Sequence, residues 1–257
     1  MNIILQHFDG ELRELDKLSV ENIKKYAERI NVDYQLVTGK PFSKNLTNPC
    51  QKVHCISHEW DDYDEVLMLD PDMFVAKDLT TNVFDYLGNG THHTWQIRLK
   101  ERLCQARVIK ESTPYWAGSF YKFNREERKR LRDKIGIFDE WKEFNRAYTY
   151  EDEGILSVLA MRANLAENYI DVKWNYDSYL PDIDKAKMIH IRTKKPGHLN
   201  GSWDNGGKVD KIINYMIYIF NYIYENCIQI GIIIVMLYAL IDSSIKVKNN
   251  ALKLLIM

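Results

Sequence analysis

Apolar residues fall into two kinds of block along the first third of the chain. Short runs at 3–5, 34–38 and 66–69 predict strands, and the continuous run at 66–69 is typical of a strand buried on both faces. Residues 20–30 repeat apolar positions with a helical period after Ser19, which we predict to be the N-cap of a helix. The alternation of strand and helix predicts a parallel sheet and a Rossmann-like nucleotide-binding half.

Shorter elements follow in the rest of the chain. Pro49 predicts the start of another helix. Further strands are predicted at 94–97, 104–109, 119–123 and 188–191, and further helices at 125–134 and 152–163. Because only charged turns separate the short strands in the middle, we expect antiparallel additions to the sheet. The expected fold class is therefore α/β, a Rossmann-like mixed sheet flanked by helices.

The C-terminal segment has a different pattern. Residues 212–241 are rich in Ile, Tyr and Met, but Glu225 divides them into uncharged runs of 13 and 16 residues. Both runs are shorter than the ~20 residues that span a bilayer. We predict a globular domain over 1–211 and a hydrophobic helical tail over 212–257. The tail either packs on the domain or attaches it to a membrane, with 228–241 inserted at the surface.

Composition excludes several classes of protein. The 257 residues include 35 basic and 36 acidic ones, so a net charge of -1 gives no reason to expect a nucleic acid partner. The four cysteines, Cys50, Cys55, Cys104 and Cys227, lack the C-x2-C spacing of a zinc site and indicate free thiols in a reducing compartment. No signal-peptide pattern precedes the first strand. We therefore expect a cytoplasmic protein, or one on the cytoplasmic side of a membrane.

The segment with the clearest chemistry follows the strand predicted at 66–69. Asp70-Pro71-Asp72 places two carboxylates one residue apart, where both can face one ligand. Nucleotides bind at the carboxyl ends of strands in such sheets, and carboxylates together with phosphates hold divalent cations. The alternative is a simple turn, since Asp and Pro are common turn residues. The apolar residues on both sides of the motif favour the metal site.

At this motif the chain resembles the GT-A glycosyltransferases, whose D-x-D motif closes a strand in the same manner. The resemblance extends from the N-terminus to about His198. It implies a metal-dependent enzyme of the hexosyltransferase type that moves a sugar from a nucleoside diphosphate, UDP in the first instance, to an acceptor hydroxyl on a glycan or glycoprotein. Mn2+ or Mg2+ would assist by stabilising the leaving diphosphate. The domain at 1–211 would then be the catalytic domain.

The resemblance also implies donor-binding residues outside the motif. Lys52 resembles a basic residue of the helix before the D-x-D strand, and Gly118 and Ser119 resemble the small-residue segment on which the sugar lies. Gln6, His7 and Phe8 follow the first strand, where these enzymes hold the nucleobase and ribose. With Lys52, Asp70, Pro71, Asp72, Gly118, Ser119 and Lys195 they make up the expected donor site.

Residues 150–154 bring three acids to the start of a predicted helix. N-capping and the helix dipole account for such acids without any catalysis. Inverting members of the fold resemble this chain in placing a general base there, which deprotonates the acceptor hydroxyl. On that basis Asp152 is the expected base, with Glu151 as the alternate.

Residues 190–198 look like the H-x-x-G-x-K-P-W element of the GT8-like branch, in which the histidine completes the metal shell and the lysine touches diphosphate. His190 and Lys195 take these places, but the glycine is missing and Gly197 replaces the tryptophan. This element favours a retaining reaction, whereas the acids at 150–154 favour an inverting one.

Two other functions fit the same pattern. A nucleotidyltransferase that makes nucleoside-diphosphate sugars shares the acidic metal ligands, but it normally has a Gly-rich phosphate loop after the first strand, where this chain has only Gly10. The other is a non-catalytic, membrane-tethered binding module in which the acids only cap helices. Metal-dependent binding of a nucleotide sugar separates these from the leading hypothesis.

Overall fold

The computed structural model describes residues 1–92, 97–105, 107, 109–136, 151–178 and 183–191. None of the helices within these ranges has the length and apolar character needed to cross a membrane. The tail at 212–257, its boundary near Lys211 and the diphosphate lysine Lys195 lie outside the described residues, so those expectations stay predictions.

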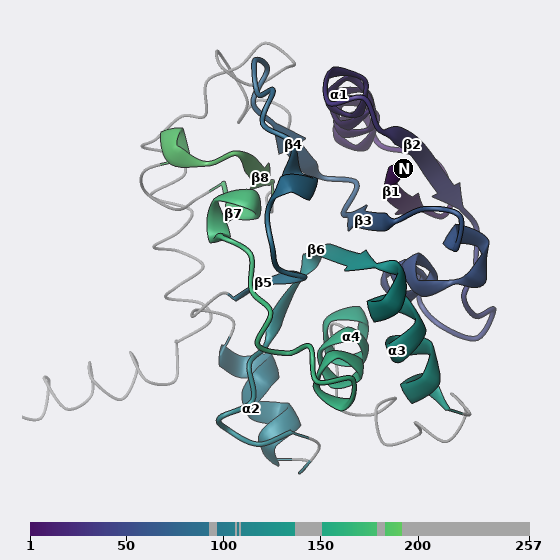
Figure 1. The fold of residues 1–257 in the computed structure, drawn as a ribbon, viewed down its shortest axis with the longest axis vertical. Coiled ribbons are helices and arrows are strands. Elements are labelled where there is room, and N and C mark those ends of the chain that lie inside the picture. The colour runs from purple at the N-terminus through teal and green to yellow at the C-terminus, as the bar shows by residue number, and fades with distance from the viewer. Residues whose placement is uncertain (93–96, 106, 108, 137–150, 179–182, 192–257) are drawn as a thin grey trace, which may run out of the picture. The chain divides into compact units, whose positions relative to one another are not determined.

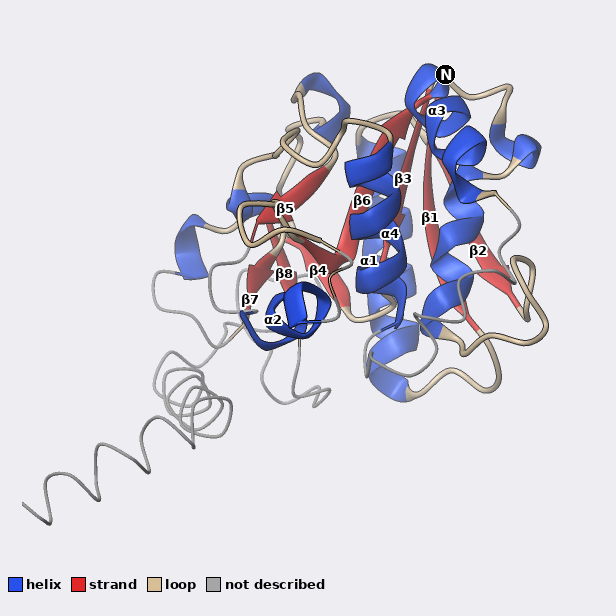
Figure 2. Cartoon of the chain, turned by 90° about the horizontal axis from the view of Figure 1, so that it is seen from below, coloured by secondary structure: helices blue, strands red, loops and turns tan. Residues whose placement is uncertain are grey.

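One five-stranded sheet forms the centre of the fold, in the order β2-β1-β3-β6-β5 (Figure 2). Its strands are β1 (Asn2–Phe8), β2 (Asp33–Thr38), β3 (Glu65–Leu69), β5 (Gly90–His92) and β6 (Trp116–Asn124). β1 pairs in parallel with β2 and β3, whereas β6 is antiparallel to both β3 and β5. The expected mixed sheet, parallel first and antiparallel later, is confirmed.

Helices cover both faces of this sheet. They are α1 (Glu14–Arg29), α2 (Ile97–Gln105), α3 (Arg125–Ile135) and α4 (Glu151–Arg162). Figure 1 shows α1 on one side of the sheet and α3 and α4 on the other. Alternate side chains of each central strand therefore enter different cores. Ile3 and Leu5 pack with Leu156 of α4, while Ile4 between them packs with Ile23 of α1.

A second, three-stranded sheet lies beside the first, in the order β4-β8-β7. It contains β4 (Met73–Val75), β7 (Tyr176–Asp177) and β8 (Met188–His190). β4 begins directly after Asp72, so the Asp70-Pro71-Asp72 turn joins the two sheets. β8 runs antiparallel to β4 with His190 opposite Met73. This pairing brings the histidine to the turn from a point far along the chain.

The predicted start of the first helix is wrong. α1 begins at Glu14, and Arg13 is its N-cap, with Asp16 accepting a hydrogen bond from the Arg13 backbone N–H. Ser19 lies inside the helix, where its hydroxyl is buried and donates to the carbonyl of Met73 at 2.6 Å. A serine before an apolar run is typical of an N-cap, but the hydroxyl of Ser19 bonds to a strand residue 54 positions along the chain and not to the start of a helix.

Two other local predictions need correction. The strands expected at 94–97 and 104–109 are contradicted where the structure describes them, because Ile97 and Cys104 belong to α2. In that helix Leu103 is buried while Glu101 and Gln105 are exposed, the pattern of a helix with one buried face. The helix expected at Pro49 is a 3-10 helix, Pro49–Ile56.

Candidate metal and nucleotide site

The Asp70-Pro71-Asp72 turn is held in place by backbone hydrogen bonds at the carboxyl end of β3. The N–H of Asp70 donates to the carbonyl of Ser119 on β6 at 3.1 Å, and the N–H of Met73 donates to the carbonyl of Asp70 at 3.1 Å. The side-chain amide of Gln6 on β1 also donates to the Asp70 carbonyl, at 2.9 Å. Both neighbouring strands thus fix the turn.

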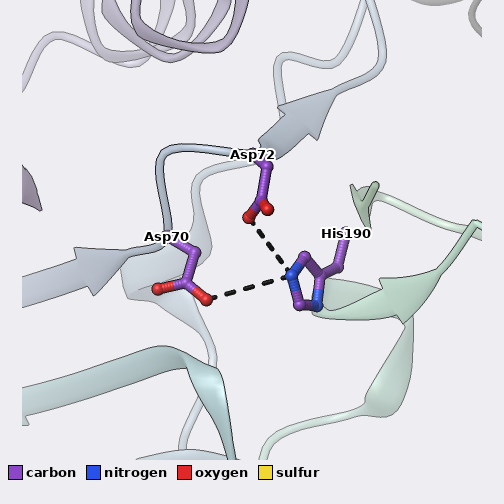
Figure 3. A group of neighbouring side chains, drawn as sticks. All are labelled: Asp70, Asp72 and His190. Carbon is purple, nitrogen blue, oxygen red and sulfur yellow. Dashed lines mark ion pairs between the residues drawn. The ribbon is translucent and has the colours of Figure 1, made fainter. Parts of the chain in front are cut away.

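Asp70, Asp72 and His190 converge at this turn (Figure 3). The Nε2 atom of His190 lies 3.1 Å from Oδ1 of Asp72 and 3.9 Å from Oδ2 of Asp70. One potential ligand atom from each residue lies within 4.8 Å of the others. The structure therefore brings together the three residues that the sequence indicated as metal ligands, and we call them the metal-ligand group.

Asp177 joins this group from behind the histidine, and sequence reasoning missed it. It is fully buried, and its Oδ1 atom lies 3.5 Å from Nδ1 of His190. β7 and β8 are parallel, and their register places Asp177 directly beside His190. A carboxylate at Nδ1 favours the tautomer in which Nε2 faces a metal. No local motif in the sequence marks this aspartate, because the pairing of β7 with β8 creates its role.

A second cluster lies next to the metal-ligand group, and we call it the Lys52 network. The buried Nζ of Lys52 lies 2.5 Å from Oδ1 of Asp70 and 2.6 Å from Oδ2 of Asp152, and donates to the carbonyl of Gly118 at 2.6 Å. Three contacts match the three N–H donors of an ammonium group. Lys52 is therefore fully engaged by protein atoms.

The charges in the two clusters are strongly linked. Burial by itself lowers the pKa of Lys52, but the carboxylates of Asp152 and Asp70 outweigh it and hold that pKa above its ordinary value. Burial raises the pKa of Asp70; Lys52 opposes this shift and the neighbouring carboxylate of Asp72 adds to it. Two carboxylates this close favour a cation between them. Lys52 supplies positive charge on one side of Asp70 only.

Asp152 forms an ion pair with Lys52, and its role as a general base stays a prediction. Its side chain is 6% exposed, and one carboxylate oxygen is engaged by Lys52. Asp152 is placed to hold Lys52. Glu151 is the first residue of α4, and its side chain lies outside the described part of the chain.

Glu153 is a further carboxylate that sequence reasoning did not single out. Its Oε1 accepts a hydrogen bond from the N–H of Gly118 at 3.0 Å, and its Oε2 accepts one from the hydroxyl of Tyr115 at 3.3 Å. A Cβ atom at Gly118 would come within 2.4 Å of Glu153 Cγ and 2.8 Å of Asp152 Oδ2. Gly118 is thus required for close packing of two carboxylates, and it is buried.

Two of the predicted donor-binding residues, Gln6 and Ser119, form hydrogen bonds within the protein behind the turn. Gln6 is fully buried; its amide donates to Ser19 and Asp70 and accepts from the hydroxyl of Tyr34. Ser119 is 3% exposed, and its hydroxyl donates to Oδ1 of Asn175 at 2.7 Å. Each side chain thus has hydrogen-bond partners inside the protein, and its contact with a donor stays a prediction.

The remaining predicted donor residues lie at strand ends near the turn. His7 is 4% exposed, and its Nε2 lies 2.7 Å from the carbonyl oxygen of Gly39, so its imidazole is also a supporting group. Phe8 and Pro71 are half-buried at the carboxyl ends of β1 and β3. Their contact with a nucleotide stays a prediction.

No protein-family model and no curated protein matches the chain. Three of the solved structures that are similar to it are of glycosyltransferases. One, involved in the glycosylation of the major capsid of PBCV-1, is 12% identical, with a TM-score of 0.49 over 74% of this chain and 92% of that one. The galactosyltransferase LgtC in complex with donor and acceptor sugar analogues is 15% identical, with a TM-score of 0.49 over 76% and 88%. An active-site mutant of LgtC is 16% identical, also at 0.49, over 75% and 87%.

Proposed function

We propose that this chain is a metal-dependent glycosyltransferase of the GT-A type that uses a nucleoside-diphosphate sugar, with UDP as the expected nucleotide. The observation that carries the proposal is the convergence of Asp70, Asp72 and His190 at the carboxyl end of a central strand. That end of a Rossmann-like sheet is where nucleotides bind. Two carboxylates and an imidazole there form a site for a cation that can hold a diphosphate.

The chemistry of the ligands favours Mn2+ over Mg2+. Mg2+ is bound mainly through oxygen atoms, whereas imidazole together with carboxylates suits a transition metal. Asp70 and Asp72 would contribute oxygen ligands and His190 a nitrogen ligand. When bound, the ion supplies Lewis-acid stabilisation of the charge that develops on the departing diphosphate.

The residues around the metal-ligand group orient it. Lys52 fixes one carboxylate oxygen of Asp70, and the other oxygen lies on the side of His190. Asp177 on the far side of the imidazole leaves Nε2 directed at the aspartates. This preorganisation means that the ligands need little rearrangement when the ion binds.

The acceptor and the cellular location belong to the same proposal. A glycan or glycoprotein hydroxyl is the expected acceptor, and Asp152, with Glu151 as the alternate, stays the expected base for it. The hydrophobic tail at 212–257 supports contact with the cytoplasmic side of a membrane, since its apolar residues are followed by Lys246, Lys248 and Lys253.

The proposal is tested by calorimetric titration of UDP into the full chain with and without Mn2+. We expect binding that requires the metal and that weakens about 100-fold or more in Asp72→Asn, because a charged ligand is lost. Asp78→Asn removes an exposed acid a short distance along the chain and should leave binding unchanged. Metal-independent binding, or none in the wild type, would overturn the proposal.

A further inference from the structure

Arg13 has a fixed orientation at the start of α1. Its Nε and Nη2 atoms each donate a hydrogen bond of 2.6 Å to the carboxylate of Asp16. Asp16 is fully buried, whereas the side chain of Arg13 is 50% exposed. A buried carboxylate that binds one edge of a guanidinium through two hydrogen bonds restricts how that group can turn. The exposed side of Arg13 is therefore held in place.

Contacts between α1 and β4 place this guanidinium beside the metal-ligand group. Ser19 donates to the carbonyl of Met73, and Asn22, three residues later, exchanges two hydrogen bonds with Val75. The helix α1 and the strand β4 therefore lie side by side and run in the same direction. One turn before Ser19, the same face of α1 carries Asp16, whose partner Arg13 is the N-cap of the helix, so the pair lies toward the end of β4 at which Asp72 precedes it. In agreement, Asp16 first and Asp72 to a smaller extent raise the pKa of Arg13.

Arg13 also has donors to spare. A guanidinium has five N–H groups, and the two bonds to Asp16 use only two of them. The other three have no hydrogen-bond acceptor among the residues that the structure describes. The planar fork of an arginine suits phosphate oxygens, and the N-terminal end of α1 adds a favourable dipole at the same point.

The balance of charge at the site favours a further cationic side chain. Asp70 and Asp72 together cancel a divalent ion, and Lys52 is already shared by two carboxylates. A diphosphate brings further negative charge, and Lys195, the lysine expected to touch it, lies outside the described residues. Arg13 shares its charge with Asp16 but keeps exposed N–H donors, and it comes from α1, on the face of the sheet opposite to the segment of Lys52.

We propose that Arg13 is a donor-binding residue that contacts the diphosphate of the nucleotide, with Asp16 as the residue that orients it. The inference rests on the proposed function and names a contact that the D-x-D motif does not include.

The test is calorimetry on the full chain at saturating Mn2+, with UDP as the probe. Arg13→Ala should weaken UDP binding about 10- to 100-fold, the range for hydrogen bonds to charged groups. The UDP affinity of Arg13→Lys should lie between those of the wild type and Arg13→Ala, because lysine keeps the charge but loses the planar fork of N–H donors. Lys17→Ala is the matched control, since it removes an exposed cation from the same helix, and its affinity should stay within about twofold of wild type.

A second titration with Mn2+ alone separates a phosphate contact from a damaged site. Arg13→Ala should bind Mn2+ at least as tightly as the wild type, because a cation near Asp72 has been removed. Wild-type UDP affinity in Arg13→Ala would overturn the inference while leaving the proposed function intact, and so would an equal loss of Mn2+ and UDP binding. Failure of the wild type to bind UDP with Mn2+ would overturn both.

Discussion

The metal-ligand group and the Lys52 network share Asp70 but differ in how their charges are balanced. In the Lys52 network, one buried ammonium is enclosed by two carboxylates and a carbonyl at hydrogen-bond distance. In the metal-ligand group, two carboxylates face one imidazole nitrogen, which in its neutral form offers a lone pair and no positive charge. In the Lys52 network the protein's own atoms balance the charges. In the metal-ligand group a divalent cation would balance them.

This difference shows that the presence of a buried carboxylate near the site does not by itself identify a catalytic group. Asp152 is more deeply buried than Asp70, yet its environment is that of a structural ion pair. A buried ion pair stabilises a fold only as a pair, since removing one partner leaves an isolated charge in a poorly solvated place. Substitutions in the two clusters should therefore change different quantities.

Removing the lysine should have the largest effect on stability. Lys52→Met leaves Asp70 and Asp152 close together without their cation, and we expect a loss of about 3–5 kcal/mol in the free energy of unfolding. Urea denaturation followed by circular dichroism measures it. Lys25→Met, on an exposed lysine of α1, should change stability by less than about 0.5 kcal/mol. A loss below about 1 kcal/mol in Lys52→Met would show that the network is not a closed ion pair.

A smaller effect, confined to metal binding, is expected behind the histidine. Asp177→Asn keeps the shape of the side chain but weakens the carboxylate's hold on Nδ1 of His190, so Mn2+ affinity should fall about 10- to 100-fold. Calorimetric titration of Mn2+ into the full chain measures this. Asp171→Asn changes an exposed acid in the preceding segment and is the control. Equal Mn2+ affinity in Asp177→Asn and wild type would show that Asp177 does not orient His190 for metal binding.

The smallest effect concerns His7, next to the Lys52 network. Burial first, and the charge of Lys52 to a smaller extent, lower the pKa of His7 below its ordinary 6.5 in the folded chain. The unfolded chain then binds the extra proton more readily, so stability rises with pH and is lost as the pH falls below about 6.5. The contribution is about 1 kcal/mol or less between pH 7 and 5.5.

His7→Gln keeps a donor for the Gly39 carbonyl but cannot titrate. Its free energy of unfolding, measured in urea at several pH values, should fall less steeply on acidification than that of the wild type. Identical slopes in the two proteins would show that His7 is protonated equally easily in the folded and unfolded states.

Local sequence patterns were sufficient for much of the fold. The apolar run at 66–69 correctly indicated β3, and the helices expected at 125–134 and 152–163 match α3 and α4 closely. Ser19 was assigned wrongly because its hydrogen-bond partner Met73 belongs to a strand that no pattern predicted. Periodicity reports burial along one element, and it contains no information about which distant group satisfies a polar side chain.

The sequence by itself determined that a carboxylate pair follows a buried strand, and it indicated His190 as a third ligand. Only the tertiary structure decided that Lys52 pairs with Asp152, that Asp177 lies behind His190 and that Gln6 and Ser119 are buried with internal hydrogen bonds. The physical reason is that ligand type and strand pattern depend on neighbours in the chain. The balance of buried charge depends on groups that come together only when the two sheets and their helices pack.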